Sequence, residues 1–65
     1  MPMPNLQARN DARHNINEAI GSLDNASYRL QRTEHNPNDY EAALQELNRA
    51  ITSIRLAQQS LGGIP

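Results

Sequence analysis

The side chains in this sequence that could carry chemistry are few. His14 has Asp11 and Glu18 about one helical turn away on either side, a spacing that could form a weak surface site for a metal ion or a proton. No second cluster completes a coordination shell, because the chain has no cysteine and only two histidines, His14 and His35. We interpret these residues as solvated side chains on an outer helix face, and we expect no metal site and no cofactor.

Catalytic groups are missing from the sequence as well. There is no cysteine nucleophile, no serine placed with a histidine and an acid, and no glycine-rich phosphate loop. A chain of 65 residues also leaves too little volume for a substrate pocket. We therefore expect no catalytic residues and a protein that is not an enzyme.

The charge of the chain argues against nucleic acid and membrane partners. Six arginines stand against seven acids, lysine is absent and the net charge is −1, so no electrostatic excess attracts a polyanion. The apolar runs are too short to cross a bilayer, and the Met-Pro-Met-Pro start has neither the basic nor the apolar region of a signal peptide. We expect a cytoplasmic protein.

Helix signals divide the chain into two helices. Asn5 follows two prolines and can cap a helix over residues 6–35. Pro37 ends that helix, because its ring disfavours the helical conformation of the residue before it. The loop then covers residues 36–38.

The second helix is expected over residues 39–61. Asn38 and Glu41 have the spacing of a capping box at its start. Gly62-Gly63 can supply the left-handed residue of a helix stop. Residues 1–65 therefore form one helical hairpin and a single domain.

A heptad repeat predicts how the helices pack. Labelling the seven positions a to g from Ile16 at a gives alanine at d and mostly large aliphatic side chains at a in both helices. The alanines at d are Ala12, Ala19, Ala26, Ala43, Ala50 and Ala57. The pattern predicts an all-α fold, an antiparallel two-helix hairpin that forms an alanine-rich coiled coil.

Folding the chain back between Asn36 and Pro37 pairs residues whose numbers sum to 73. Each layer then matches a large residue at a with an alanine at d, such as Leu23 with Ala50. On the g side this register places Arg29 near Glu46, which predicts an ion pair.

The e positions add apolar residues beside this seam. On this side Ile20 is expected near Ile51 and Leu44 near Ser27, and a hairpin cannot cover such a patch itself. Two copies that pack these faces would form a four-helix bundle. The expected interface residues are Ile16, Ile20, Leu23, Leu30, Tyr40, Leu44, Leu47, Ile51, Ile54 and Leu61.

The heptad layout over residues 12–61 resembles that of the repressor-of-primer family of helical hairpins. The resemblance implies a dimeric four-helix bundle and, as one alternative, an RNA-binding regulator. A second alternative is an adaptor hairpin that docks on a larger helical protein. Our main interpretation is a small structural or regulatory protein-protein interaction module that acts as a homodimer. The sequence leaves open whether the two hairpins run in the same or in opposite directions.

Overall fold

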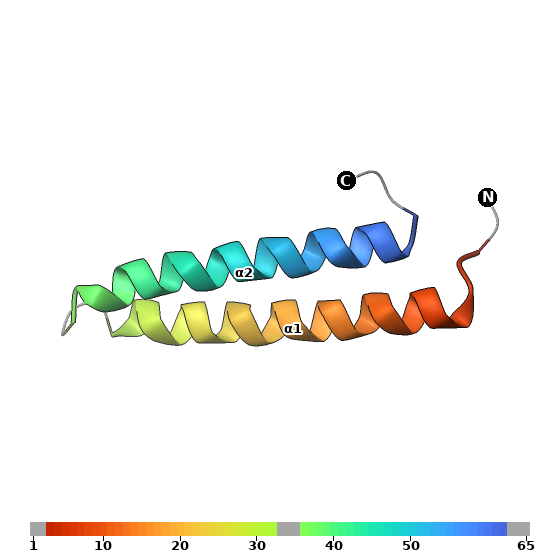
Figure 1. Cartoon of the computed structure of the whole chain (residues 1–65). Helices are drawn as coiled ribbons and strands as arrows, with labels where there is room; N and C mark the ends of the chain where they lie inside the picture. Colours follow the sequence, from red (N-terminus) through yellow and green to blue (C-terminus); the bar gives the residue numbers. More distant parts are fainter. Residues whose placement is uncertain (1–2, 33–35, 63–65) are drawn as a thin grey trace.

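The chain folds as two long helices that lie side by side in opposite directions (Figure 1). The computed structural model describes residues 3–32 and 36–62. Helix α1 is Leu6–Gln31 and helix α2 is Asn38–Ser60, and no strand occurs in the described residues. The molecule measures 50 × 18 × 13 Å. The predicted all-α helical hairpin is confirmed.

The start of α1 follows the prediction, whereas its end comes earlier. The Asn5 side-chain oxygen accepts a hydrogen bond of 2.7 Å from the Ala8 amide, as an N-cap does. At the other end, the Arg32 amide donates to the Arg29 carbonyl three residues back, which tightens the last turn. The helix therefore ends at Gln31, and residues 33–35 of the predicted extension lie outside the described residues.

The predicted capping box at the start of α2 is wrong. Asn38 already belongs to the helix, and it is the Asn36 side-chain oxygen that accepts the Asn38 amide, at 3.1 Å. Pro37 explains the shift, because its φ of −57° is already helical and its missing N–H is not needed in a first turn. The chain thus enters the helix earlier than Asn38 and Glu41 indicate.

The end of α2 confirms the role of glycine in the helix stop. The helix ends at Ser60, and the Leu61 amide donates to the Ala57 carbonyl at 3.1 Å. Gly62 then has a φ of +79°, the left-handed conformation that glycine adopts without steric cost. Its partner in the predicted stop, Gly63, lies outside the described residues.

The seam between the helices is made of alanine. All six alanines at position d are buried, with 1–5% of their surface exposed, and the only other buried residue among those described is Asp39. Residues at position g, such as Ser22 and Ser53, are half-buried. Position a is more open, since Ile16 and Ile54 keep 44% and 43% of their surface exposed. The helices therefore meet over positions d and g, and most of the large residues at a lie beside the seam.

The two helices are therefore rotated about their own axes relative to the prediction, in which large residues stack on alanine. The packing of the seam explains this difference. Helices whose innermost position, d, carries only methyl groups can approach toward the close end of the usual range of about 8 to 10 Å between axes. At that separation a leucine or isoleucine has no room between the two backbones. The side chains at a are displaced to one side of the seam, where they stay partly exposed.

Enlarging an alanine in the seam should destabilise the hairpin. We expect Ala19→Leu and Ala50→Leu each to lower the free energy of unfolding by about 1 to 3 kcal/mol, because the added side chain separates the helices. The control is Gln45→Leu at an exposed outer position, which should change it by less than about 0.5 kcal/mol. Denaturant titration measures all three, and unchanged stability in both alanine variants would show that the seam lies elsewhere.

A substitution at Gly21 in α1 should instead stabilise the hairpin. A Cβ atom built on this glycine meets nothing within 4 Å, so alanine fits without strain. We expect Gly21→Ala to raise the free energy of unfolding by about 0.5 to 1 kcal/mol, because glycine is a poor helix former. A loss of stability in the same titration would contradict the exposed position of this residue.

Candidate interaction surface

The predicted interface residues form one apolar surface on the hairpin, which we call the apolar face. It consists of ten large apolar side chains at positions a and e of the two helices: Ile16, Ile20, Leu23, Leu30, Tyr40, Leu44, Leu47, Ile51, Ile54 and Leu61. Leu6, also at position e, is the first residue of α1 and is 65% exposed. Leu47 is half-buried, and the other members are 43–56% exposed. Position e follows position a around a helix, so each helix carries these residues as one stripe.

Contacts at position g show that both stripes lie on the same side of the hairpin. Arg29 and Asp39 both occupy position g, and their side chains meet across the two helices at 3.2 Å. Ser22 and Ser53, also at g, line one groove. Because the g positions of the two helices meet on one face, their a and e positions share the opposite face.

An apolar surface of this extent is typical of a protein interface. Single exposed leucines are ordinary on soluble proteins, whereas a contiguous row of exposed aliphatic side chains is not. Two other exposed apolar residues, Leu56 and Tyr28, lie off this surface at positions c and f. Leu56 is 44% exposed, and Tyr28 packs its ring against the Arg32 guanidinium, 5.5 Å from the ring centre. The apolar residues on the face thus form a continuous surface, unlike these two.

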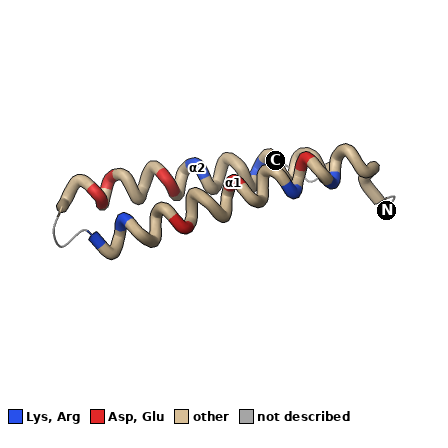
Figure 2. The backbone as a smooth tube through the Cα atoms, turned by 90° about the horizontal axis from the view of Figure 1, so that it is seen from below, with Lys and Arg blue, Asp and Glu red and all other residues tan. Residues whose placement is uncertain are grey.

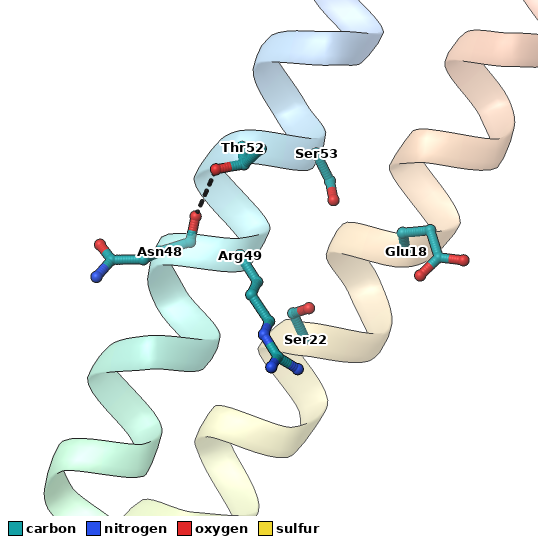
Figure 3. Close-up of a pocket in the computed structure, with 6 residues that line it drawn as sticks. All are labelled: Glu18, Ser22, Asn48, Arg49, Thr52 and Ser53. Atoms are coloured by element: carbon teal, nitrogen blue, oxygen red, sulfur yellow. Dashed lines mark hydrogen bonds between the residues drawn. The ribbon is translucent and has the colours of Figure 1, made fainter.

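An open polar groove lies on the g side of the hairpin (Figure 3). Its lining residues are Glu18, Ser22, Asn48, Arg49, Thr52 and Ser53. The Thr52 hydroxyl donates to the Asn48 carbonyl of its own helix at 3.1 Å, and no histidine or cysteine lines the groove. The lining side chains therefore do not include the serine-histidine or cysteine-histidine pair of nucleophilic catalysis.

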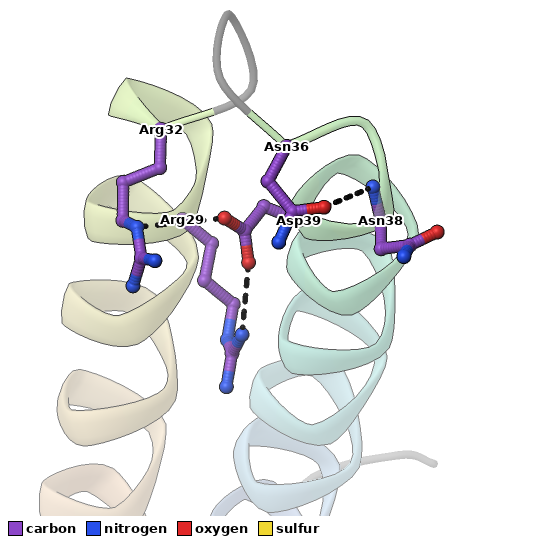
Figure 4. Close-up of polar contacts among 5 residues, drawn as sticks. All are labelled: Arg29, Arg32, Asn36, Asn38 and Asp39. Atoms are coloured by element: carbon purple, nitrogen blue, oxygen red, sulfur yellow. Dashed lines mark hydrogen bonds and ion pairs between the residues drawn. The ribbon is translucent and has the colours of Figure 1, made fainter.

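A cluster of charges joins the helices near the loop (Figure 4). The carboxylate of Asp39 is 7% exposed and lies 3.2 Å from Arg29 Nη1 and 3.6 Å from Arg32 Nε. The longer contact exceeds hydrogen-bonding distance, so Asp39 Oδ2 has an ionic neighbour but no hydrogen bond. Two partly exposed arginines of α1 thus balance the charge of a buried acid in the first turn of α2.

The predicted ion pair between Arg29 and Glu46 is wrong, because Arg29 belongs to this cluster. Arg29 turns toward Asp39, whereas Glu46 contacts Arg49 at 3.3 Å and Asn25 at 3.4 Å. Asp39 lies one heptad, about two turns, before Glu46 on the same side of α2. The sequence register therefore chose an acid about two turns too far along α2, and the acid that Arg29 contacts also lies near Arg32.

The histidine site considered from the sequence has a single weak contact. His14 Nε2 lies 3.7 Å from Glu18 Oε1, and both side chains are more than 60% exposed. Among the described residues no three histidines or acids gather in a geometry that could hold a metal ion. Within the same residues, neither α1 nor α2 has a stretch long and apolar enough to cross a bilayer.

Comparison with known proteins adds no relative. No family model matches the chain, and no curated protein or solved structure shows significant similarity to it. The function must therefore be inferred from the surfaces described above.

Removing the buried charge should weaken the loop end of the hairpin. We expect Asp39→Asn to lower the free energy of unfolding by about 1 to 2 kcal/mol, because two charge-assisted contacts are lost while both arginines can still turn to water. The control is Glu18→Gln, an exposed acid of α1 with only a 3.7 Å contact to His14, which should cost less than about 0.5 kcal/mol. Equal effects of the two variants in thermal unfolding would show that burial of Asp39 is unimportant.

Proposed function

We propose that this chain is a non-enzymatic structural or regulatory protein-protein interaction module that acts as a homodimer. Two hairpins pack their apolar faces together and form a four-helix bundle. The outer surfaces of the bundle then remain available to other partners.

The observation that carries the proposal is the contrast between what the hairpin buries and what it exposes. The buried side chains of the described residues are six alanines and one aspartate, while most members of the apolar face are exposed. A chain of about this size buries only about 60% of its unfolded surface even when compact. Small scaffolds usually need disulfides, a metal or a partner chain, and this sequence has no cysteine. A partner chain would supply the missing core.

The size of the apolar face suits a second copy of the hairpin. A 26-residue helix is about 39 Å long, and the molecule is 18 Å wide, so the face offers on the order of 700 Å² per copy. A pair would bury about 1,400 Å² in total, which falls within the range of stable protein interfaces. A two-fold dimer is self-complementary, so one apolar surface serves both copies.

The remaining surfaces of the hairpin are polar and carry both signs of charge. Figure 2 shows acids and arginines interspersed along α1, and acids near the loop followed by arginines in α2. With a net charge of −1 this surface has no general attraction for polyanions. A dimer of this kind is suited to bind other proteins through the polar and charged side chains of its outer surfaces. Its function is to assemble and to present these side chains.

A charge placed on the apolar face should prevent dimerisation. We expect light scattering at micromolar concentration to give about twice the 7.3 kDa chain mass for the unaltered protein. Ile51→Lys should weaken the dimer by at least about 10-fold, because the lysine would be buried against the second copy. Leu56→Lys is the matched control, since Leu56 lies on the same helix with similar exposure, 44% against 47%, but off the apolar face.

Two outcomes would contradict the proposal. One is a folded monomer at micromolar concentration, and the other is an equal loss of dimer in the Ile51 and Leu56 variants. The second result would mean that the two chains meet through another surface.

A further inference from the structure

Charges around the apolar face are sorted by sign along the hairpin. Position b adjoins position e, so the a, e and b positions together form the face and its rim. The described charged residues at these positions, which we call the rim charges, are Arg9, Arg13, Asp24, Glu41 and Arg55. The three arginines lie in the half of the hairpin that contains the two chain ends, and the two acids lie in the half next to the loop.

These rim charges are not used inside the hairpin. Within the described residues Arg13, Asp24, Glu41 and Arg55 are exposed and take part in none of the ion pairs or side-chain hydrogen bonds. Arg9 contacts only the sulfur of Met3, at 3.7 Å. The arginines of the opposite face differ, since two of them are paired with Asp39 and one with Glu46. The rim charges therefore remain available for a second molecule.

We infer that two copies of the chain pack their apolar faces in opposite directions, with the loop of each copy over the open end of the other. This inference rests on the proposed homodimer and specifies its geometry. The occupant of the apolar face is thus a second copy in one defined orientation.

Charge complementarity selects this orientation. With the copies reversed, the arginines at the open end of one hairpin face the acids near the loop of the other. With both copies in the same direction, arginines face arginines and acids face acids. Both arrangements bury similar apolar area, so the rim decides between them. Exposed pairs are individually weak and are screened by salt, but reversal changes every rim contact from repulsive to attractive.

A distance between two identical labels tests the orientation directly. The chain has no cysteine, so Gln31→Cys places one spin label per copy near the loop end of α1. Gln31 lies about 19 Å along the helix from the middle of α1. Double electron–electron resonance spectroscopy should therefore give a distance of about 35 to 40 Å between the two spin labels in the reversed dimer. In a dimer of parallel copies the labels would lie less than about 25 Å apart, close to the 18 Å width of the hairpin.

Asn17→Cys is the control for the label experiment. Asn17 is exposed at position b near the middle of α1, so its two labels should be close in either orientation. Light scattering on the labelled samples separates the two ways in which the account can fail. A monomer overturns the proposed function and the orientation with it, whereas a dimer with a short Gln31 distance overturns the orientation alone.

Charge reversal provides an independent test of the rim. Asp24→Arg with Glu41→Arg should weaken the dimer by about 10-fold at low salt, and adding Arg9→Glu with Arg13→Glu should restore the affinity. Glu18→Arg, an exposed charge off the rim, is the control and should have no such effect. If the four substitutions together fail to restore the affinity lost by the first two, the rim does not set the orientation.

Discussion

The alanine seam between the two helices is the constraint on which the rest of the structure depends. Alanine at every d position of α1 and α2 lets the backbones come together, and these methyl groups make up the whole buried apolar core of the described residues. A seam this narrow has no space for a larger side chain. The leucines and isoleucines of the heptads are therefore forced to one side, where they form a continuous apolar face.

The same constraint makes the hairpin an incomplete unit. Each methyl group contributes little to the hydrophobic free energy of folding, because burial of one methyl or methylene group contributes only about 0.8 kcal/mol. The larger aliphatic side chains could contribute several times more, but the hairpin alone leaves them partly exposed. A second molecule that covers the face would complete the core. Folding and association are then two parts of one process, which is why we propose a homodimer rather than a self-sufficient hairpin.

Local chemistry and heptad counting predicted much of this structure from the sequence. The two helices, the Asn5 cap and the left-handed Gly62 follow from short-range rules. The rotation of the helices about their own axes did not, because pairing residues by number fixes layers along the seam and not which side of each helix is innermost. The Arg29–Asp39 contact was missed for a related reason. The loop geometry, with Pro37 already in a helical conformation before α2 begins, decides where a charge in the first turn of α2 will lie.

Coupling between folding and association is the central claim, and the concentration dependence of thermal unfolding tests it most directly. Circular dichroism can follow the loss of helix from about 1 to about 100 µM chain. If the apolar face is completed by a second copy, the melting temperature rises steadily with concentration, since dilution favours the separated and unfolded chains. A fully helical chain whose melting temperature is the same at every concentration would contradict the account.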